Sequence, residues 1–162
     1  MYNKILAPMD GSKLSECSME HVSEIASGCH SSKVILLTVL RPIIIPGEAW
    51  SVSAKQNEKL NAEIQKEEAQ MEEDARKYLT GQSENLKKAG INSDVVILKA
   101  SEAGEIAGAI LDFAEKNQVD LIIMSTHGRS GPSRWAFGSV TDKVVRTSSI
   151  PVLTIAPAGC RI

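Results

Sequence analysis

The segment VDLIIM, residues 119–124, decides the fold class. Apart from one aspartate its side chains are all apolar, so a strand built from it would present apolar groups to both faces of a sheet. Strands of this kind belong inside parallel sheets that helices cover on both sides. The segment therefore predicts a central strand of a parallel sheet in an α/β protein.

Strand and helix patterns alternate on either side of this segment. Before it, residues 94–98 have the composition of a strand, and residues 103–115 carry apolar side chains at helical spacing. The predicted buried face of that helix comprises Ile106, Ala109, Ile110 and Phe113. After the central strand, the sequence predicts a helix over 138–146 and a last strand, PVLTIA, over 151–156.

The first forty residues predict a β-α-β unit. Two apolar runs, 4–9 and 33–40, flank a helix, and its predicted buried face comprises Cys17, Val22, Ile25 and Ala26. Ser12 or Ser15 would cap the start of this helix, and Gly28 would lie just past its end. The connection is too long for a hairpin, so the two strands are expected to be parallel.

The middle of the chain predicts a loop and a long helix. Residues 41–54 contain two prolines and no sustained periodicity, which indicates an excursion loop or a lid. Residues 56–88 are dominated by Glu, Lys, Ala and Gln, which have strong helix propensity. Gly81 leaves open a kink or two separate helices, and Gly90 is expected to end this stretch.

Together these segments predict five strands that alternate with four or more helices. The expected fold is α/β, a Rossmann-like, doubly wound five-stranded parallel sheet with helices on both faces. No linker, repeat or low-complexity tract interrupts the chain, so residues 1–162 are expected to form a single domain. Aromatic residues are only 4% of the sequence, and aliphatic side chains must therefore fill the core.

Charge and composition disfavour several classes of partner. Eighteen basic and twenty acidic residues give a net charge of −2, which supplies no broad field for a nucleic acid or an anionic membrane. The N-terminal segment indicates a strand rather than a signal peptide, and the apolar run 34–40 is far shorter than the about 20 residues of a membrane span. The three cysteines show no metal-ligand spacing and are expected to be reduced thiols in a cytoplasmic protein.

Two segments are candidates for a ligand site, because doubly wound sheets bind ligands beyond the carboxyl ends of their strands. One is APMDGS, residues 7–12, and the other is STHGRSGPSRWAFGSVTDK, residues 125–143. The second segment combines glycines and two arginines with the start of a helix, where backbone N–H groups and the helix dipole favour a phosphate. Ordinary turn glycines followed by a serine cap are the alternative. The spacings of a P-loop, a dinucleotide fingerprint and a nucleophile elbow are absent from the sequence.

In combination, the two segments resemble the universal stress protein family, over essentially the whole chain from KILAPMDGS to the terminal PVLTIAP. The nucleotide-binding branch of that family carries the motif G-x2-G-x9-G-[S/T]. Gly128, Gly138 and Ser139 match the motif, whereas Ser125 stands at its first glycine position. That serine would add a side chain beside the ribose, while the phosphate half of the motif is intact.

The resemblance implies a regulatory stress-response protein that binds ATP, or AMP or ADP, with Mg²⁺ held by phosphate oxygens. The adenine and ribose end would comprise Ala7, Pro8, Met9 and Asp10, with the Asp10 carboxylate accepting from ribose hydroxyls and Val39 packing on the adenine. The phosphates would be surrounded by Gly128, Arg129, Gly138, Ser139, Val140 and Thr141. The implied site also includes Met124, Ser125, His127 and Gly131. For Asp10, a role in the turn before Ser12 is the alternative.

The sequence predicts a binding module, because it shows no carboxylate pair, metal triad or catalytic triad. His127 has no assignable partner for general base catalysis and is expected to position the loop. Two alternatives remain open: a weak ATPase or autophosphorylating protein, and a nucleotide-free scaffold dimer, to which Ser125 points. The resemblance also implies a homodimer formed by pairing of the last strand across a twofold axis, and a downstream protein partner of unknown identity.

Overall fold

The computed structural model describes residues 2–43, 54–101, 105–126 and 137–156. Its strands are β1 (Lys4–Pro8), β2 (Lys33–Leu40), β3 (Ser93–Lys99), β4 (Leu121–Ser125) and β5 (Val152–Ile155). Its helices are α1 (Lys13–Glu16), α2 (Ser18–Gly28), α3 (Ala54–Lys88), α4 (Ile106–Lys116) and α5 (Ser139–Thr147). The predicted alternation of strands and helices is confirmed, with β2 at the predicted residues.

The five strands form one parallel sheet in the order β3-β2-β1-β4-β5. The chain moves outward from β1 to β3, crosses back beside β1, and then moves outward again from β4 to β5. The predicted doubly wound sheet is therefore confirmed. Every residue of β4 is buried, as its apolar sequence predicts, but β1 rather than β4 takes the middle position.

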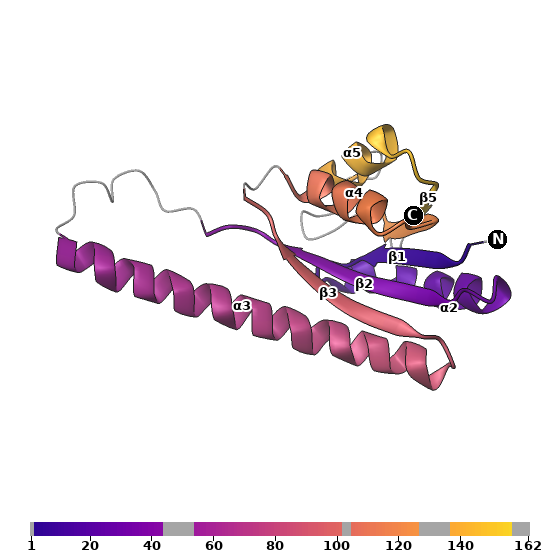
Figure 1. Cartoon of the computed structure of the whole chain (residues 1–162), viewed down its shortest axis with the longest axis horizontal. Coiled ribbons are helices and arrows are strands. Elements are labelled where there is room, and N and C mark those ends of the chain that lie inside the picture. Colours follow the sequence, from indigo (N-terminus) through magenta and orange to yellow (C-terminus); the bar gives the residue numbers. More distant parts are fainter. Residues whose placement is uncertain (1, 44–53, 102–104, 127–136, 157–162) are drawn as a thin grey trace.

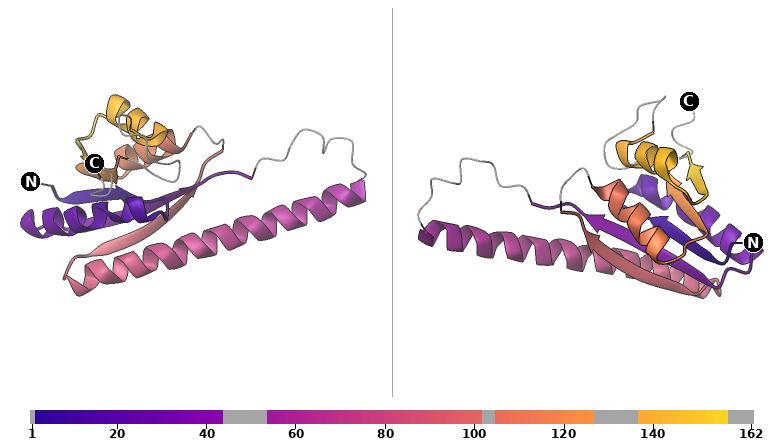
Figure 2. Two further views of the ribbon diagram at one scale, coloured as in Figure 1. Left: turned by 180° about the vertical axis from the view of Figure 1, so that it is seen from behind. Right: turned by 45° about the horizontal axis from the view of Figure 1, so that its top comes forward.

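Successive residues of each inner strand face opposite sides of the sheet, and each side has its own apolar core. In β1, Ile5 packs with α2 and α3 through Val22 and Leu79, and Leu6 packs with α4 and α5 through Ile110 and Val144. Figures 1 and 2 show these two pairs of helices on opposite faces of the sheet. This three-layer arrangement explains why consecutive residues in the middle of the inner strands are apolar.

The first predicted helix is divided into two short helices, α1 and α2, at Cys17. Ser12 is the N-cap of α1, and its hydroxyl accepts a hydrogen bond from the backbone N–H of Ser15 at 3.1 Å. Cys17 is exposed, so its predicted place on the buried face is wrong; the break between the helices removes it from the face that carries Val22. Gly28 is the last residue of α2 rather than the residue beyond it.

The predicted long helix is one continuous element, α3, and neither a break nor a second helix occurs at Gly81. Figure 1 shows its C-terminal part beneath β2 and β3 and its N-terminal part extending beyond the sheet. Leu79 and Leu86 anchor the C-terminal part in the core. The helix ends before Gly90, whose φ of +78° suits a residue without a side chain.

The buried face of α4 differs in part from the prediction. Ala107, Ile110 and Ala114 are buried, whereas Ala109 is only half-buried. Ile106 and Phe113 are half-buried and pack against the same core from the edge of this face. Among the residues that the structure describes, no helix has both the length and the apolar character required to cross a membrane.

Candidate functional site

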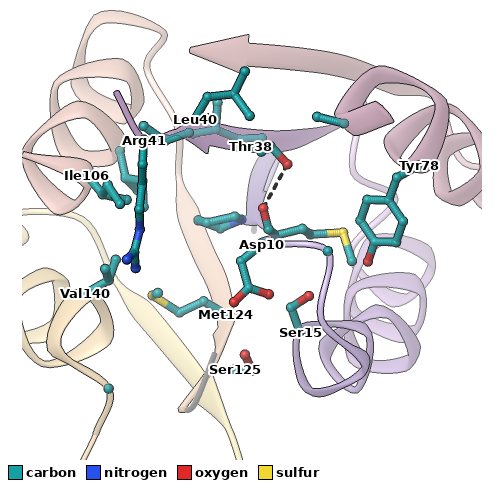
Figure 3. A pocket seen from close by; sticks show the side chains of 18 of the residues that line it. Asp10, Ser15, Thr38, Leu40, Arg41, Tyr78, Ile106, Met124, Ser125 and Val140 are labelled. Carbon is teal, nitrogen blue, oxygen red and sulfur yellow. Dashed lines mark hydrogen bonds between the residues drawn. The ribbon is translucent and has the colours of Figure 1, made fainter. Parts of the chain in front are cut away.

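A cavity of about 470 Å³ opens at the carboxyl ends of β1, β2 and β4 (Figure 3). It lies where the strand order reverses between β1 and β4, which is the usual ligand site of a doubly wound sheet. Residues at the carboxyl ends of the three strands and just beyond form its floor, the first turn of α5 and part of α4 form one wall, and α1 and α3 form the opposite wall. Its volume is in the range of small-molecule sites.

The end of β1 contributes Pro8, Met9 and Asp10 to the cavity, as the sequence predicts. Hydrogen bonds join this segment to β2: the N–H of Met9 donates to the carbonyl of Leu37 at 2.7 Å, and the hydroxyl of Thr38 donates to the carbonyl of Met9 at 2.8 Å. Ala7 does not line the cavity. Its side chain is fully buried in the core with Ile5 and Leu36 on the α2 and α3 side.

Asp10 both shapes a turn and lines the cavity. Its Oδ1 accepts from the N–H of Ser12 at 3.0 Å and from the hydroxyl of Ser12 at 2.6 Å, and these bonds shape the turn into α1. The side chain also lines the cavity, and Figure 3 shows its carboxylate directed into the space between Ser15 and Met124. The turn thus holds a hydrogen-bond acceptor at a defined point of the cavity wall.

The first turn of α5 forms the facing wall through Gly138, Ser139, Val140 and Thr141. Gly138 is the N-cap and supplies no side-chain cap, so the first N–H groups of α5 lack the usual acceptor from a capping side chain. The helix start is joined to β4 by the N–H of Gly138, which donates to the carbonyl of Thr126 at 2.8 Å. Backbone donors at a helix start, presented to a cavity, favour an anionic group.

Thr141 and Ser125 lie together where β4 meets α5. The buried hydroxyl of Thr141 donates to the carbonyl of Ser125 at 3.0 Å, so this side chain joins α5 to the sheet. Ser125 is itself buried and lines the cavity. The serine at the first motif position therefore lies within the predicted site.

One half of the cavity is apolar. Met124 and Val39 line it from β4 and β2, Val140 lines it from α5, and Ile106 and Ile110 line it from α4. These side chains give flat apolar surfaces on which a planar ring can pack. Sequence reasoning missed the two isoleucines, because their helical periodicity indicated only a buried face.

The other half is more polar and includes four residues of α3, which sequence reasoning also missed: Met71, Asp74, Ala75 and Tyr78. The hydroxyl of Tyr78 is buried and forms no hydrogen bond with another described residue. Burial raises the pKa of Tyr78 to about 12, and the negative charge of Glu16 acts in the same direction. Tyr78 is therefore a neutral phenol at pH 7.

Four predicted site residues lie outside the described residues: His127, Gly128, Arg129 and Gly131. In the part of the chain that the structure describes, no group of three or more histidine, cysteine, aspartate and glutamate side chains is arranged to hold a metal ion.

The amino-acid sequence matches the model of a known family over nearly the whole chain. The model of the Universal stress protein family matches residues 1–156. The chain belongs to the universal stress protein family. One relative among the universal stress proteins is MJ0531 of Methanocaldococcus jannaschii, 31% identical over 158 residues that cover 96% of this chain and 82% of that protein.

Solved structures of universal stress proteins share the fold. The structure of MJ0577, a universal stress protein of M. jannaschii, has a TM-score of 0.78 and 26% identity and covers 97% of both chains. At 16% identity, the fold is shared with the Arabidopsis thaliana protein At3g01520 with AMP bound, at a TM-score of 0.61 and coverage of 97% of this chain and 94% of that one. The Archaeoglobus fulgidus protein in complex with dAMP, also 16% identical, has a TM-score of 0.60 and coverage of 96% and 98%.

Proposed function

We propose that this universal stress protein binds an adenine nucleotide in the cavity and acts as a nucleotide-dependent regulatory module. The observation that carries the proposal is the cavity itself, which brings Asp10, an apolar pocket and the uncapped start of α5 together where the strand order reverses. Proteins of the same fold have been solved with AMP and with dAMP, which supports an adenine nucleotide as the ligand.

The parts of a nucleotide correspond to the parts of the cavity. The adenine ring would pack on Val39, in the apolar half of the cavity. Asp10 would accept hydrogen bonds from the ribose hydroxyls, and the N–H groups at the start of α5 would bind the phosphates. We infer ATP as the physiological ligand, with Mg²⁺ held mainly by its phosphate oxygens.

A bound nucleotide would regulate by stabilising the state that binds it. Ligand contacts on both walls would join β1, β2 and β4 to α5 through one molecule, and the conformation with these elements in place would gain stability in proportion to ligand saturation. We propose that this nucleotide-dependent change is what a partner protein in the cytoplasm recognises.

The first test is to identify any nucleotide that copurifies, by acid release and anion-exchange chromatography, and then to titrate ATP with Mg²⁺ into the stripped protein by calorimetry. Gly138→Asp places a carboxylate at the α5 N-cap. At about 5 Å from a phosphate charge, the repulsion between the two is about 3 kcal/mol at an effective dielectric constant of about 20. The affinity for ATP should therefore fall roughly a hundredfold. The stability of the fold should be retained, because aspartate is a good N-cap.

Gly81→Asp is the matched control, since Gly81 is exposed on α3 and a side chain there meets nothing within 4 Å. Its ATP affinity should equal that of the wild type. A stripped wild-type protein that binds no nucleotide in the presence of Mg²⁺ would refute the proposal and favour a nucleotide-free scaffold.

We also propose a homodimer that forms through β5. This strand pairs with β4 on one side, and its four residues are half-buried in the single chain. The carbonyl of Pro151 accepts from Ile122 of β4, and that of Ile155 accepts from Thr126 just after β4. Alternation therefore directs the backbone groups of Val152 and Thr154 to the other edge. An edge of this kind tends to be covered.

The dimer is tested by the solution mass of the wild type and of Thr154→Pro, which removes an outward N–H without altering the bonds to β4. We expect a dimer for the wild type and a monomer for the variant at micromolar concentration by light scattering. A monomeric wild type, or a variant that remains a dimer, would argue against this interface.

A further inference from the structure

The charged residues of the cavity lie on different walls. Two carboxylates, Asp10 and Asp74, line the half of the cavity that faces α1 and α3. Arg41 follows directly after β2 and is the one cationic side chain among the described residues that line the cavity. The cavity therefore has an acidic side and a basic side.

Arg41 is directed across the cavity rather than away from it. Figure 3 shows its side chain passing Ile106 and ending beside Val140 and Met124. No ion pair or side-chain hydrogen bond joins it to another described residue, and the residue is exposed. A guanidinium has five N–H donors, and no described side chain forms a hydrogen bond or ion pair with those of Arg41.

The end of the Arg41 side chain lies at the wall that α5 forms. The first turn of α5 presents backbone N–H groups without a capping side chain, and Arg41 adds a full positive charge from the neighbouring strand end. An anion held between the two would interact with donors from opposite sides. Guanidinium groups bind phosphates strongly, because two parallel N–H groups can contact two phosphate oxygens.

We propose that Arg41 determines which nucleotides this site prefers, so that adenosine polyphosphates bind more tightly than AMP, and AMP more tightly than adenosine. The inference rests on the proposed nucleotide site and assigns its ligand class. Each further phosphate adds negative charge near Arg41, while the contacts of adenine and ribose stay the same. The preference therefore follows ligand charge rather than ligand size.

The test is calorimetric titration of ATP, AMP and adenosine into the wild type, R41Q and K143Q. The buffer contains EDTA and low salt, so that ATP keeps its full charge and screening is weak. Lys143 is exposed on α5 and does not line the cavity, so K143Q makes the same charge change outside the site. Equal melting temperatures of the three proteins would show that the fold is unaffected.

We expect R41Q to lower the affinity for ATP about tenfold and that for AMP about threefold, and to leave adenosine within twofold of the wild type. K143Q should change none of the three by more than twofold. An equal loss for all three ligands would overturn the inference, because Arg41 would then act on the base or ribose. Unchanged ATP affinity in R41Q would overturn it as well.

Failure of the proposed function has a different signature. A wild-type protein that binds none of the three ligands would overturn the nucleotide site and this inference with it. If the wild type binds ATP and R41Q has lost the order of preference, both stand. R41K should retain most of the preference for ATP over adenosine, since the charge remains and only the paired N–H geometry is lost.

Discussion

Replacing Tyr78 by phenylalanine should stabilise the protein in the absence of ligand. The Tyr78 hydroxyl is buried and unbonded among the described residues, and a buried polar group without a partner costs about 1–3 kcal/mol. The substitution removes the hydroxyl and keeps the packed ring. Taking the lower end of that range, because the ring is only half-buried, we expect a gain of about 1 kcal/mol in the free energy of unfolding. For a chain of 162 residues this is a rise of about 2–4 °C in Tm.

The measurement is urea and thermal denaturation of the wild type, Tyr78→Phe and Tyr2→Phe. Tyr2 is the other tyrosine of the chain and packs, partly buried, against the same core. Its substitution should change stability by less than about 0.5 kcal/mol. If Tyr78→Phe lowered the free energy of unfolding, the hydroxyl would have to be hydrogen-bonded, and the reasoning from its burial would be refuted.

The same variant should change the response to alkaline pH. Burial raises the pKa of Tyr78 from 10.0 to about 12, so the folded state holds this proton more tightly than the unfolded state. Stability is therefore unaffected by this group below about pH 10 and falls as the pH rises toward 12, because the unfolded state loses the proton first. Tyr78→Phe should therefore lose less stability than the wild type over this interval, and identical pH profiles of the two proteins would contradict the assignment.

Two further substitutions test how the site is held together. Thr141→Val removes the buried hydrogen bond to the carbonyl of Ser125 and should cost about 1–2 kcal/mol of stability and several-fold in nucleotide affinity. The control Thr147→Val, at an exposed position of the same helix, should cost less than about 0.5 kcal/mol. Equal losses of stability in urea denaturation would show that the bond to Ser125 does not stabilise the fold. Leu79→Ala leaves a cavity at a fully buried position where α3 packs on the sheet, and it should lower the free energy of unfolding by about 2–5 kcal/mol. Thr80→Ala, at the exposed neighbouring position, should change it very little. A small loss of stability in Leu79→Ala would mean that α3 is not anchored there.

Local patterns were reliable where one segment of chain carries its own signal. The bounds of β2 and the buried character of β4 follow from apolar runs, and the end of α3 follows from Gly90. The start of α5 follows from Gly138 and Ser139. These features depend on neighbours in the sequence, whose spacing is visible in a single chain.

Other features were missed because they depend on which face of a helix or strand a residue occupies, or on contacts between distant segments. A helix break at Cys17 changed which residues face the core, and no periodicity before the break indicates it. Ala7 was assigned to the site by its place in a motif, yet strand alternation turns it into the core. Arg41 and Tyr78 carry no motif and became site residues only because two strand ends and a helix converge on one cavity.

The sequence by itself determined the class of fold, most of the strands and helices, and the two segments that contribute to the cavity, because each depends on local patterns of apolar, glycine and charged residues. Only the tertiary structure decided that β1 lies in the middle of the sheet, that α3 completes the cavity, and that the acidic and basic side chains of the cavity face each other from different walls. The physical reason is that strand order and cavity shape arise from pairings between residues far apart in the chain, and local spacing does not encode which distant partner each element meets.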